Sequence, residues 1–217
     1  NNMQQSLTII GSGWISQHFL NDYAHKFHPI ITISKSSPPP KQSTHHYYYD
    51  IYNQPTLTIP LTDICIITLP FKKSLTDPEK YSSAIIELSK KIHINNYKKI
   101  IFTSSTSIYA NSNKVATETT ACDTTDRALT LKKAEDYLLQ QNKHTLILRL
   151  AGICGKNRNS RNKASSSQII DASTPMNLIH VNDIINFIHN ACINNYSSDI
   201  INLCCSDHPS RKTYYTF

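Results

Sequence analysis

Glycine is scarce in this chain, and long apolar runs are absent from it. Only four glycines occur among the 217 residues, and no apolar run approaches the roughly 18 residues that cross a bilayer as a helix. Residues 1–5 are polar and lack the apolar stretch of a secretory signal peptide. The sequence therefore predicts no membrane segment and no export signal, and we expect the protein in the cytoplasm.

Cysteine and histidine occur without the spacings of metal or redox motifs. None of the six cysteines forms the Cys-x-x-Cys pair that zinc sites and thioredoxin-like proteins use. His45 and His46 are adjacent, so in a strand their side chains would point to opposite faces. We therefore predict no metal site, and we expect reduced cysteines, as in a reducing compartment.

Positive charge exceeds negative charge but forms no dense block. The formal net charge is +7 at pH 7, and the basic residues are scattered, with one loose group at Lys156, Arg158, Arg161 and Lys163. A nucleic-acid surface usually gathers its lysines and arginines on one face. We predict no nucleic-acid partner, and the charge balance favours phosphorylated or acidic small molecules instead.

Short apolar runs alternate with longer amphipathic segments along the chain. The runs predict strands at residues 7–10, 30–33, 46–49, 64–69, 100–103, 146–148, 178–181 and 200–203. Amphipathic spacing predicts helices around residues 81–92, 131–138 and 184–191. An earlier helix is predicted from apolar residues that recur every four positions and so form one stripe: Ile15, Phe19, Tyr23 and Phe27.

This alternation predicts the fold class. Apolar strands that alternate with helices are typical of a Rossmann-like, doubly wound α/β fold, a parallel sheet with helices on both faces. Such a fold binds its ligand at the carboxyl ends of the strands, where the strand order reverses. We expect one domain over residues 1–217, with residues 156–177 and 205–217 contributing a small substrate-side region.

A glycine turn joins the first predicted strand to the first predicted helix. Gly11 permits a tight turn, and Gly13 lets a diphosphate approach the backbone at the start of the helix. Ser16 stands where the usual motif has its third glycine, and serine is small enough to keep helix and strand close. The turn from Gly11 through Ser12, Gly13 and Trp14 to Ile15 therefore predicts an NAD(P) site; a merely structural turn is the alternative.

The end of the second predicted strand bears on the choice of cofactor. An acidic residue there would bind the ribose 2′-hydroxyl of NAD, but residues 33–37 contain no carboxylate. Lys35 and the hydroxyls of Ser34 and Ser36 would instead suit a 2′-phosphate. We therefore favour NADP over NAD, although a lysine at this place is also common as a solvated surface residue.

Three further segments, together with the glycine turn, resemble one family. Residues 101–109, 148–155 and 178–184 resemble the fifth-strand, sixth-strand and Ile-His-Val-x-Asp segments of the extended short-chain dehydrogenases/reductases, which include nucleotide-sugar epimerases and dehydratases. The resemblance implies an NAD(P) cofactor, a nucleotide sugar or related small carbonyl compound as substrate, and a possible homodimer.

The resemblance also implies positions for further cofactor contacts. Leu69 and Pro70 after the fourth strand, Thr103 in the fifth and Gly152 after the sixth complete the predicted cofactor-binding set. Asp50 follows the third strand, where the family places an acid near the adenine amine; a strand-ending aspartate is the alternative.

The resemblance fails at the catalytic pair. Ser105 matches the serine that hydrogen-bonds the substrate oxygen in the family, but its Tyr-x-x-x-Lys pair is missing from residues 127–137. Aligning Glu135 with the family's glutamate places Arg127 at the tyrosine and Leu131 at the lysine. The chain thus looks like an atypical branch of the superfamily.

Two residues are candidates to act in place of the missing pair. Arg127 carries a planar guanidinium that suits a carboxylate or phosphate, so it could orient an anionic substrate, but it is no base at neutral pH. Tyr109 is a candidate substitute acid, and a packing role is its alternative.

Two functions therefore remain open. One is an NAD(P)-dependent oxidoreductase or nucleotide-sugar-modifying enzyme of the epimerase/dehydratase type. The other is a dinucleotide-binding sensor or regulatory module with little or no turnover, and the missing pair favours it.

Overall fold

A parallel β-sheet forms the centre of the molecule in a computed structural model that describes residues 3–53, 55–112, 114–155, 173 and 175–208. Over those residues its order is β3-β2-β1-β4-β5-β6-β9, and every neighbouring pair is parallel. The strands are β1 Gln5–Ile10, β2 Phe27–Ser34, β3 His45–Tyr48, β4 Ile64–Ile67, β5 Lys99–Ser105, β6 Thr145–Leu150 and β9 Asp199–Leu203. The order reverses between β1 and β4, which confirms the predicted doubly wound fold.

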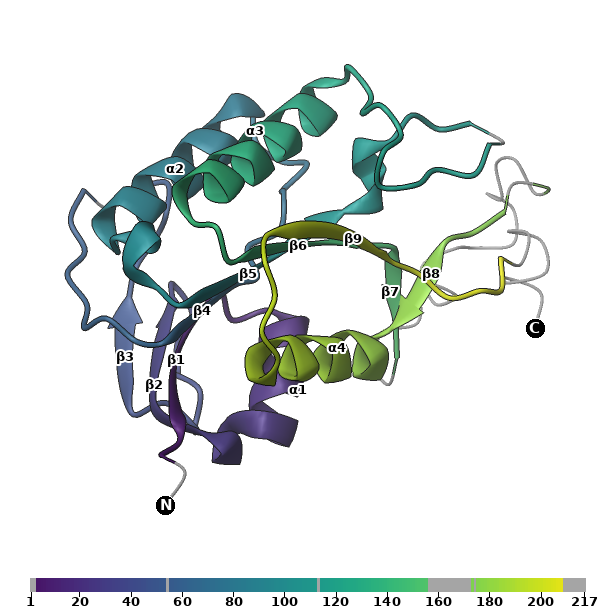
Figure 1. The fold of residues 1–217 in the computed structure, drawn as a ribbon. Coiled ribbons are helices and arrows are strands. Elements are labelled where there is room, and N and C mark those ends of the chain that lie inside the picture. Colours follow the sequence, from purple (N-terminus) through teal and green to yellow (C-terminus); the bar gives the residue numbers. More distant parts are fainter. Residues whose placement is uncertain (1–2, 54, 113, 156–172, 174, 209–217) are drawn as a thin grey trace.

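Helices cover both faces of this sheet (Figure 1). Helices α1 (Trp14–Tyr23) and α4 (Val181–Ile193) pack on one face, and α2 (Glu79–Lys91) and α3 (Asp126–Gln141) pack on the other. Short 3₁₀ turns lie at Ala24–Lys26 (η1), Ile94–Asn96 (η2) and Thr106–Ile108 (η3). Because the central strands β1, β2, β4, β5 and β6 are covered on both sides, they are largely apolar runs rather than alternating ones. The edge strands β3 and β9 are more exposed.

Side chains of one strand enter two separate cores. Leu7 and Ile9 of β1 pack with α1 and α4, whereas Ile10 packs with α2 and α3. All three side chains are at most 1% exposed. Burial of a side chain of this size stabilises a fold by roughly 1.5–3 kcal/mol, so both helical layers are held to the sheet by the same strands.

Two sequence-based expectations were wrong in detail. Phe27 does not continue the stripe of the first helix, because η1 ends that helix and Phe27 is the first residue of β2. The strand predicted at residues 178–181 is present as β8 (Leu178–His180), but Val181 already begins α4. β8 pairs with β7 (Gly152–Cys154) in a small separate parallel sheet. His180 then caps α4, where its Nδ1 accepts a bond from the Asn182 N–H at 3.1 Å.

A buried ion pair joins α3 to the sheet. Arg149 of β6 donates from Nη2 to Glu135 Oε1 at 2.6 Å, and both residues are at most 1% exposed. Ser104 Oγ donates to Glu135 Oε2 at 2.6 Å, so the carboxylate also contacts β5. Burial alone would lower the pKa of Arg149, but the bonds to Glu135 and Tyr109 outweigh it and leave that pKa raised.

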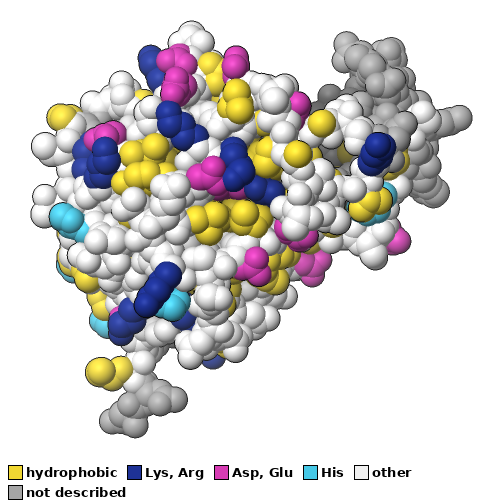
Figure 2. Space-filling model, turned by 45° about the horizontal axis from the view of Figure 1, so that its top comes forward, with side chains coloured by type: hydrophobic (Ala, Val, Ile, Leu, Met, Phe, Trp, Pro, Cys, Tyr) yellow, Lys and Arg dark blue, Asp and Glu magenta, His cyan; other side chains and the backbone are white. Residues whose placement is uncertain are grey.

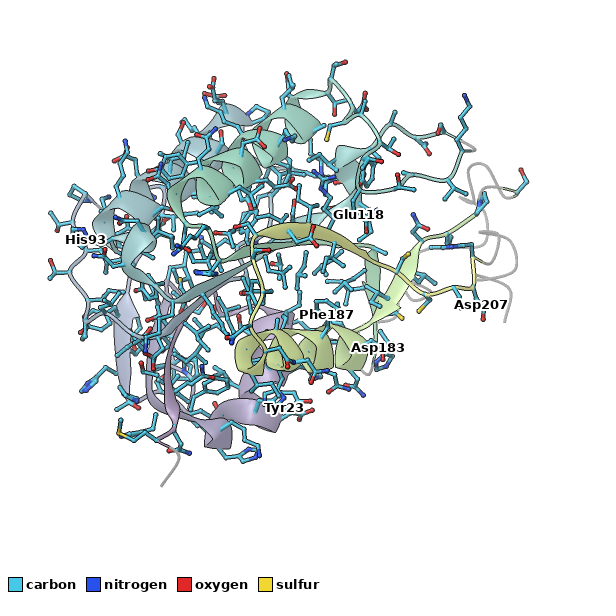
Figure 3. The ribbon with its side chains drawn as sticks, in the orientation of Figure 1. Tyr23, His93, Glu118, Asp183, Phe187 and Asp207 are labelled. Atoms are coloured by element: carbon cyan, nitrogen blue, oxygen red, sulfur yellow. The ribbon has the colours of Figure 1, made fainter. Side chains whose placement is uncertain are left out.

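Polar contacts also join neighbouring segments on each side of the sheet. Tyr23 and Glu118, labelled in Figure 3, lie on opposite sides of the sheet. The Tyr23 hydroxyl donates to Asn186 of α4, and its ring stacks on His189 at 4.2 Å. Glu118 Oε1 accepts from the Asn202 N–H at 2.8 Å and so covers part of β9, the edge strand of the sheet.

The surface carries both signs of charge close together. Figure 2 shows Lys and Arg side chains among Asp and Glu side chains, with the side of α2 and α3 brought forward. Lys133 Nζ lies 2.7 Å from Glu79 Oε1, and Lys132 pairs with Asp136. The visible face therefore shows the scattered charge that the sequence predicted.

Two features are absent from the part of the chain that the structure describes. No helix among them is long and apolar enough to cross a membrane. No group of three His, Cys, Asp or Glu side chains in the same part of the chain is placed to hold a metal ion. Cys65, Cys122, Cys192, Cys204 and Cys205 are free thiols. Most of residues 156–177 and 205–217, the predicted substrate-side region, lies outside the described residues.

We predict that Glu135→Leu destabilises the fold by about 3–5 kcal/mol, because it leaves the Arg149 guanidinium buried without its counter-ion. Urea unfolding of the two proteins measures this difference. The double variant Glu135→Leu, Arg149→Met is the control, and it should recover much of the loss because no unpaired charge remains. A single variant that loses less than about 1 kcal/mol would contradict the importance of the pair.

Candidate functional site

The turn after β1 lies directly against the end of β4. Gly11 has φ +103°, and a Cβ at this position would lie 2.6 Å from Thr68 Oγ1. The Gly11 N–H also donates to the Ile33 carbonyl at the end of β2, at 2.9 Å. Only glycine meets both demands, a left-handed backbone and no side chain. The turn is thus fixed at the point where the strand order reverses.

Gly13 faces open space. It is the N-cap of α1, and a Cβ built on it meets no described atom within 4 Å. The first turn of α1 contains no acidic residue, so the partial positive charge of this helix end is not offset there. The beginning of α1 therefore has both the room and the polarity that an anion needs.

Ser16 replaces the third glycine of the motif at no cost in packing. Its side chain is 1% exposed, and its Oγ lies 2.5 Å from Thr68 Oγ1. Thr68 Oγ1 in turn lies 3.0 Å from the Ile10 carbonyl, to which it donates. The serine hydroxyl is thus satisfied, and α1 lies close against β1 and β4.

Two adjoining pockets follow the carboxyl ends of the strands. The first has a volume of about 320 Å³ and runs from Gly13 toward β5 and β6. The second has a volume of about 240 Å³ and runs from Gly13 toward β2 and β3. Both pockets are lined by Gly13, Thr68 and Pro70, so they meet at the glycine turn and extend to its two sides.

Every residue predicted to bind the cofactor lines one of these pockets. The first pocket is lined by Gly13, Trp14, Ile15, Pro70, Thr103 and Gly152. The second is lined by Gly11, Ser12, Gly13, Ser34, Lys35, Ser36, Leu69 and Pro70. Of the predicted catalytic residues, Ser105 and Arg127 line the first pocket. Tyr109 is not part of either lining.

The second pocket brings two lysines together. Lys35 follows β2, and Lys72 lies in the segment between β4 and α2. The nearness of Lys35 lowers the pKa of Lys72, because two ammonium groups repel one another. Asp50 lines the same pocket, and its pKa is lowered chiefly by the bond from the Tyr52 N–H and also by both lysines.

Hydroxyl groups stand beside this lysine pair. Ser34 Oγ is buried and has no hydrogen-bond partner among the described residues. Ser12 Oγ donates to Ser36 Oγ at 2.7 Å, which joins the glycine turn to the end of β2. This side of the pocket thus combines positive charge with hydroxyl groups, a set of donors that suits a phosphate.

Ser105 begins the loop that lines the first pocket. Its Oγ lies 2.8 Å from Ser107 Oγ and accepts from the Ser107 N–H at 3.1 Å. This bond caps η3, so the Ser105 hydroxyl also has a structural role in the turn. The hydroxyl proton remains able to reach a ligand, because Ser105 is only half-buried and lies in the pocket wall.

Arg127 and Leu131 share the wall formed by α3. Both line the first pocket, one helical turn apart. The Arg127 guanidinium lies over the Phe71 ring, with Cζ 5.4 Å from the ring centroid. The structure therefore places at this wall the two residues that the alignment put at the family's tyrosine and lysine positions.

Tyr109 is engaged elsewhere. It is 9% exposed, and its hydroxyl accepts from Arg149 Nη1 at 2.8 Å and donates to Asn202 Oδ1 at 2.8 Å. Its ring also lies beneath the Arg149 guanidinium. These contacts favour the packing role over that of a substitute acid.

Sequence reasoning did not single out Lys72, Thr68, Phe71 or Tyr81 as site residues. Lys72 and Phe71 lie in an irregular segment where no spacing marks them, and only the fold brings them to the pockets. Tyr81 donates to the Leu69 carbonyl at 2.6 Å, and burial raises its pKa. Thr68 gave one usable signal, a hydroxyl at the end of an otherwise apolar strand.

Comparison with known proteins finds relatives by sequence in two strains of Escherichia coli, K12 and O157:H7, and in both the relative is Protein YeeZ. Protein YeeZ of Escherichia coli strain K12 is 32% identical over 160 residues, which make up 70% of this chain and 57% of YeeZ. The chain therefore spans less than two thirds of that relative. No family profile matches the chain.

Solved structures with the same fold include complexes with NAD and with uridine nucleotides. WbmG of Bordetella bronchiseptica in complex with NAD and UDP superposes with a TM-score of 0.78 at 12% identity, over 98% of this chain and 76% of WbmG. MoeE5 in complex with UDP-glucose and NAD superposes with a TM-score of 0.76 at 14% identity, over 96% of this chain and 79% of MoeE5. A UDP-N-acetylglucosamine 4-epimerase of Methanobrevibacter ruminantium superposes with a TM-score of 0.77 at 17% identity, over 98% of this chain and 80% of the epimerase. The chain thus shares the Rossmann-like α/β fold of these three proteins.

Proposed function

We propose that the chain binds NADP(H) along the two adjoining pockets and acts as an oxidoreductase on a nucleotide sugar or a related small carbonyl compound. One observation carries the proposal. Residues from five separate segments, all predicted as cofactor contacts, line a pair of pockets that meet at the glycine turn. A merely structural turn gives no reason for them to gather there.

The residues present fit a dinucleotide. The open space at Gly13 and the uncapped start of α1 suit a diphosphate, which the backbone N–H groups of a helix N-terminus bind well. The second pocket would then receive the adenosine half, with Asp50 near the base, and the first would receive the nicotinamide half. The structural neighbours MoeE5 and WbmG are complexes with NAD, which supports a nicotinamide dinucleotide here.

The second pocket supports NADP over NAD. A 2′-phosphate there would lie near Lys35 and Lys72, and it would relieve their mutual repulsion. It would also offer an acceptor to Ser34 Oγ, which is buried and unpartnered among the described residues. NAD carries no phosphate at that position, so it leaves these groups without a partner.

Ser105 is the residue we assign to the substrate oxygen. When bound, the nicotinamide supplies hydride transfer, and the protein then has to position the substrate and stabilise its oxygen. The Ser105 hydroxyl can donate to that oxygen while Ser107 holds its Oγ in place at 2.8 Å. Arg127 stays protonated at neutral pH and so contributes charge rather than proton transfer.

A binding module with little turnover is the second candidate. The α3 wall presents Arg127 and Leu131 where the family has its acid/base pair, so neither position can remove a proton. NADPH consumption with a panel of nucleotide sugars and small carbonyl compounds separates the two functions. The enzyme is supported if the protein turns over a substrate, Ser105→Ala abolishes that turnover and the control variant Ser112→Ala keeps it. The binding module is supported if the protein binds the cofactor but turns over no substrate.

Two glycine variants test whether a diphosphate binds at the turn. We expect Gly13→Ala to leave the free energy of unfolding within about 0.5 kcal/mol, because its methyl group meets open space. The same methyl would occupy the room of the ligand, so NADPH affinity should fall about tenfold or more. Calorimetric titration and urea unfolding give the two values.

Gly11→Ala is the matched comparison. It should cost about 1–3 kcal/mol of stability as well as affinity, because a side chain at φ +103° is strained and strikes Thr68. Unchanged NADPH affinity in Gly13→Ala would count against a diphosphate at the turn.

The lysine pair makes a separate prediction. In the double variant Lys35→Ala, Lys72→Ala, NADPH affinity should fall about tenfold to a hundredfold, whereas NADH affinity should stay within about threefold. Lys73→Ala, which removes a charge that lines neither pocket, is the control. Tighter binding of NADH than of NADPH by the unaltered protein would overturn the preference.

A further inference from the structure

Arg127 is the one charged side chain among the described residues that line the first pocket. It is the second residue of α3, whose start is fixed by Thr125, since Oγ1 of that residue accepts from the Ala128 N–H at 3.3 Å. The rest of the lining is apolar or carries hydroxyl and backbone groups. The pocket therefore has a positive charge and no side-chain anion of its own.

The Arg127 guanidinium lacks a counter-ion within the part of the chain that the structure describes. None of the ion pairs found there includes Arg127, although the other arginine of the described core, Arg149, is fully paired. Arg127 Nε is buried and has no hydrogen-bond partner in the same part of the chain. An unsatisfied buried donor on a cation is costly, and a ligand anion would remove that cost.

The direction of approach bears on where such an anion would lie. Helix α1, whose start we assign to the diphosphate, packs on one face of the sheet, and α3 packs on the other (Figure 1). Arg127 thus reaches the pocket from the opposite side to α1. It shares the wall with Ser104 and Ser105 of β5, and the second of these is the residue that we assign to the substrate oxygen.

We propose that Arg127 binds a carboxylate or phosphate carried by the substrate itself, so that the preferred substrate is a small carbonyl compound or alcohol with an anionic group near its reacting carbon. Phe71 supports this role, because the ring beneath the guanidinium holds its plane in position. A planar guanidinium can then form two parallel bonds to the anion. The inference rests on the proposed cofactor site, which supplies the redox partner.

Trp14 provides the readout. It is the only tryptophan in the chain, and it lines the first pocket. Its fluorescence can be followed while dihydroxyacetone phosphate or pyruvate is added, each compared with a neutral counterpart, dihydroxyacetone or butanedione. The titrations are run on the protein alone and on the protein with NADP⁺, so that a failure of cofactor binding is seen separately.

We expect the unaltered protein to bind at least one anionic probe about tenfold or more tightly than its neutral counterpart. Arg127→Met should abolish that difference, and Arg127→Lys should restore part of it, because lysine keeps the charge but not the planar fork. Affinity for NADP⁺ should change by less than about threefold in these variants. Lys133→Met, which removes a charge from the same helix outside this pocket, is the control.

Three outcomes would overturn the inference. One is equal binding of anionic and neutral probes by the unaltered protein, and another is an anion preference that survives Arg127→Met. The third is a loss of NADP⁺ affinity in Arg127→Met with probe binding intact, which would assign Arg127 to the cofactor diphosphate. If neither the unaltered protein nor any variant bound NADP⁺, the proposed function would be overturned instead. The titrations of anionic and neutral probes without cofactor would still decide the role of Arg127.

Discussion

The close contact between Gly11 and Thr68 is the constraint on which the site depends. With only 2.6 Å between Thr68 Oγ1 and the place of a Gly11 Cβ, the chain can turn here only without a side chain. The Thr68 hydroxyl also bonds to the Ile10 carbonyl and to Ser16, so one group fixes the end of β1, the end of β4 and the first helix. This contact sets the position of the start of α1, and both pockets begin there.

A second constraint holds the opposite wall of the site. Glu135 and Arg149 bind one another in the interior, and Ser104 and Tyr109 complete their bonds. The ion pair joins the middle of α3 to β6, and through Ser104 it also reaches β5. Arg127, at the start of the same helix, therefore projects from a rigid element rather than from a loop, which suits a residue that must hold a ligand in one orientation.

The sequence was sufficient for the architecture because the strands are continuous apolar runs between amphipathic helices, and local pattern decides such elements. It failed at Phe27, whose spacing fits the helical stripe although η1 has already ended the helix. It also did not give the partner of β8, because a short strand carries no signal for its partner. Pocket-lining residues within motifs were predictable, whereas Lys72 and Phe71 were not, because only the folded chain brings them to the pockets. The homodimer and the substrate-side region stay predictions.

The proposed function depends above all on the start of α1 binding the diphosphate of a nicotinamide dinucleotide. A crystal structure of the protein soaked with NADPH tests it most directly. We expect diphosphate oxygens within about 2.7–3.2 Å of backbone N–H groups at the start of α1, with the adenosine half beside Lys35. A nucleotide bound elsewhere, or an empty turn at saturating NADPH, would contradict the account.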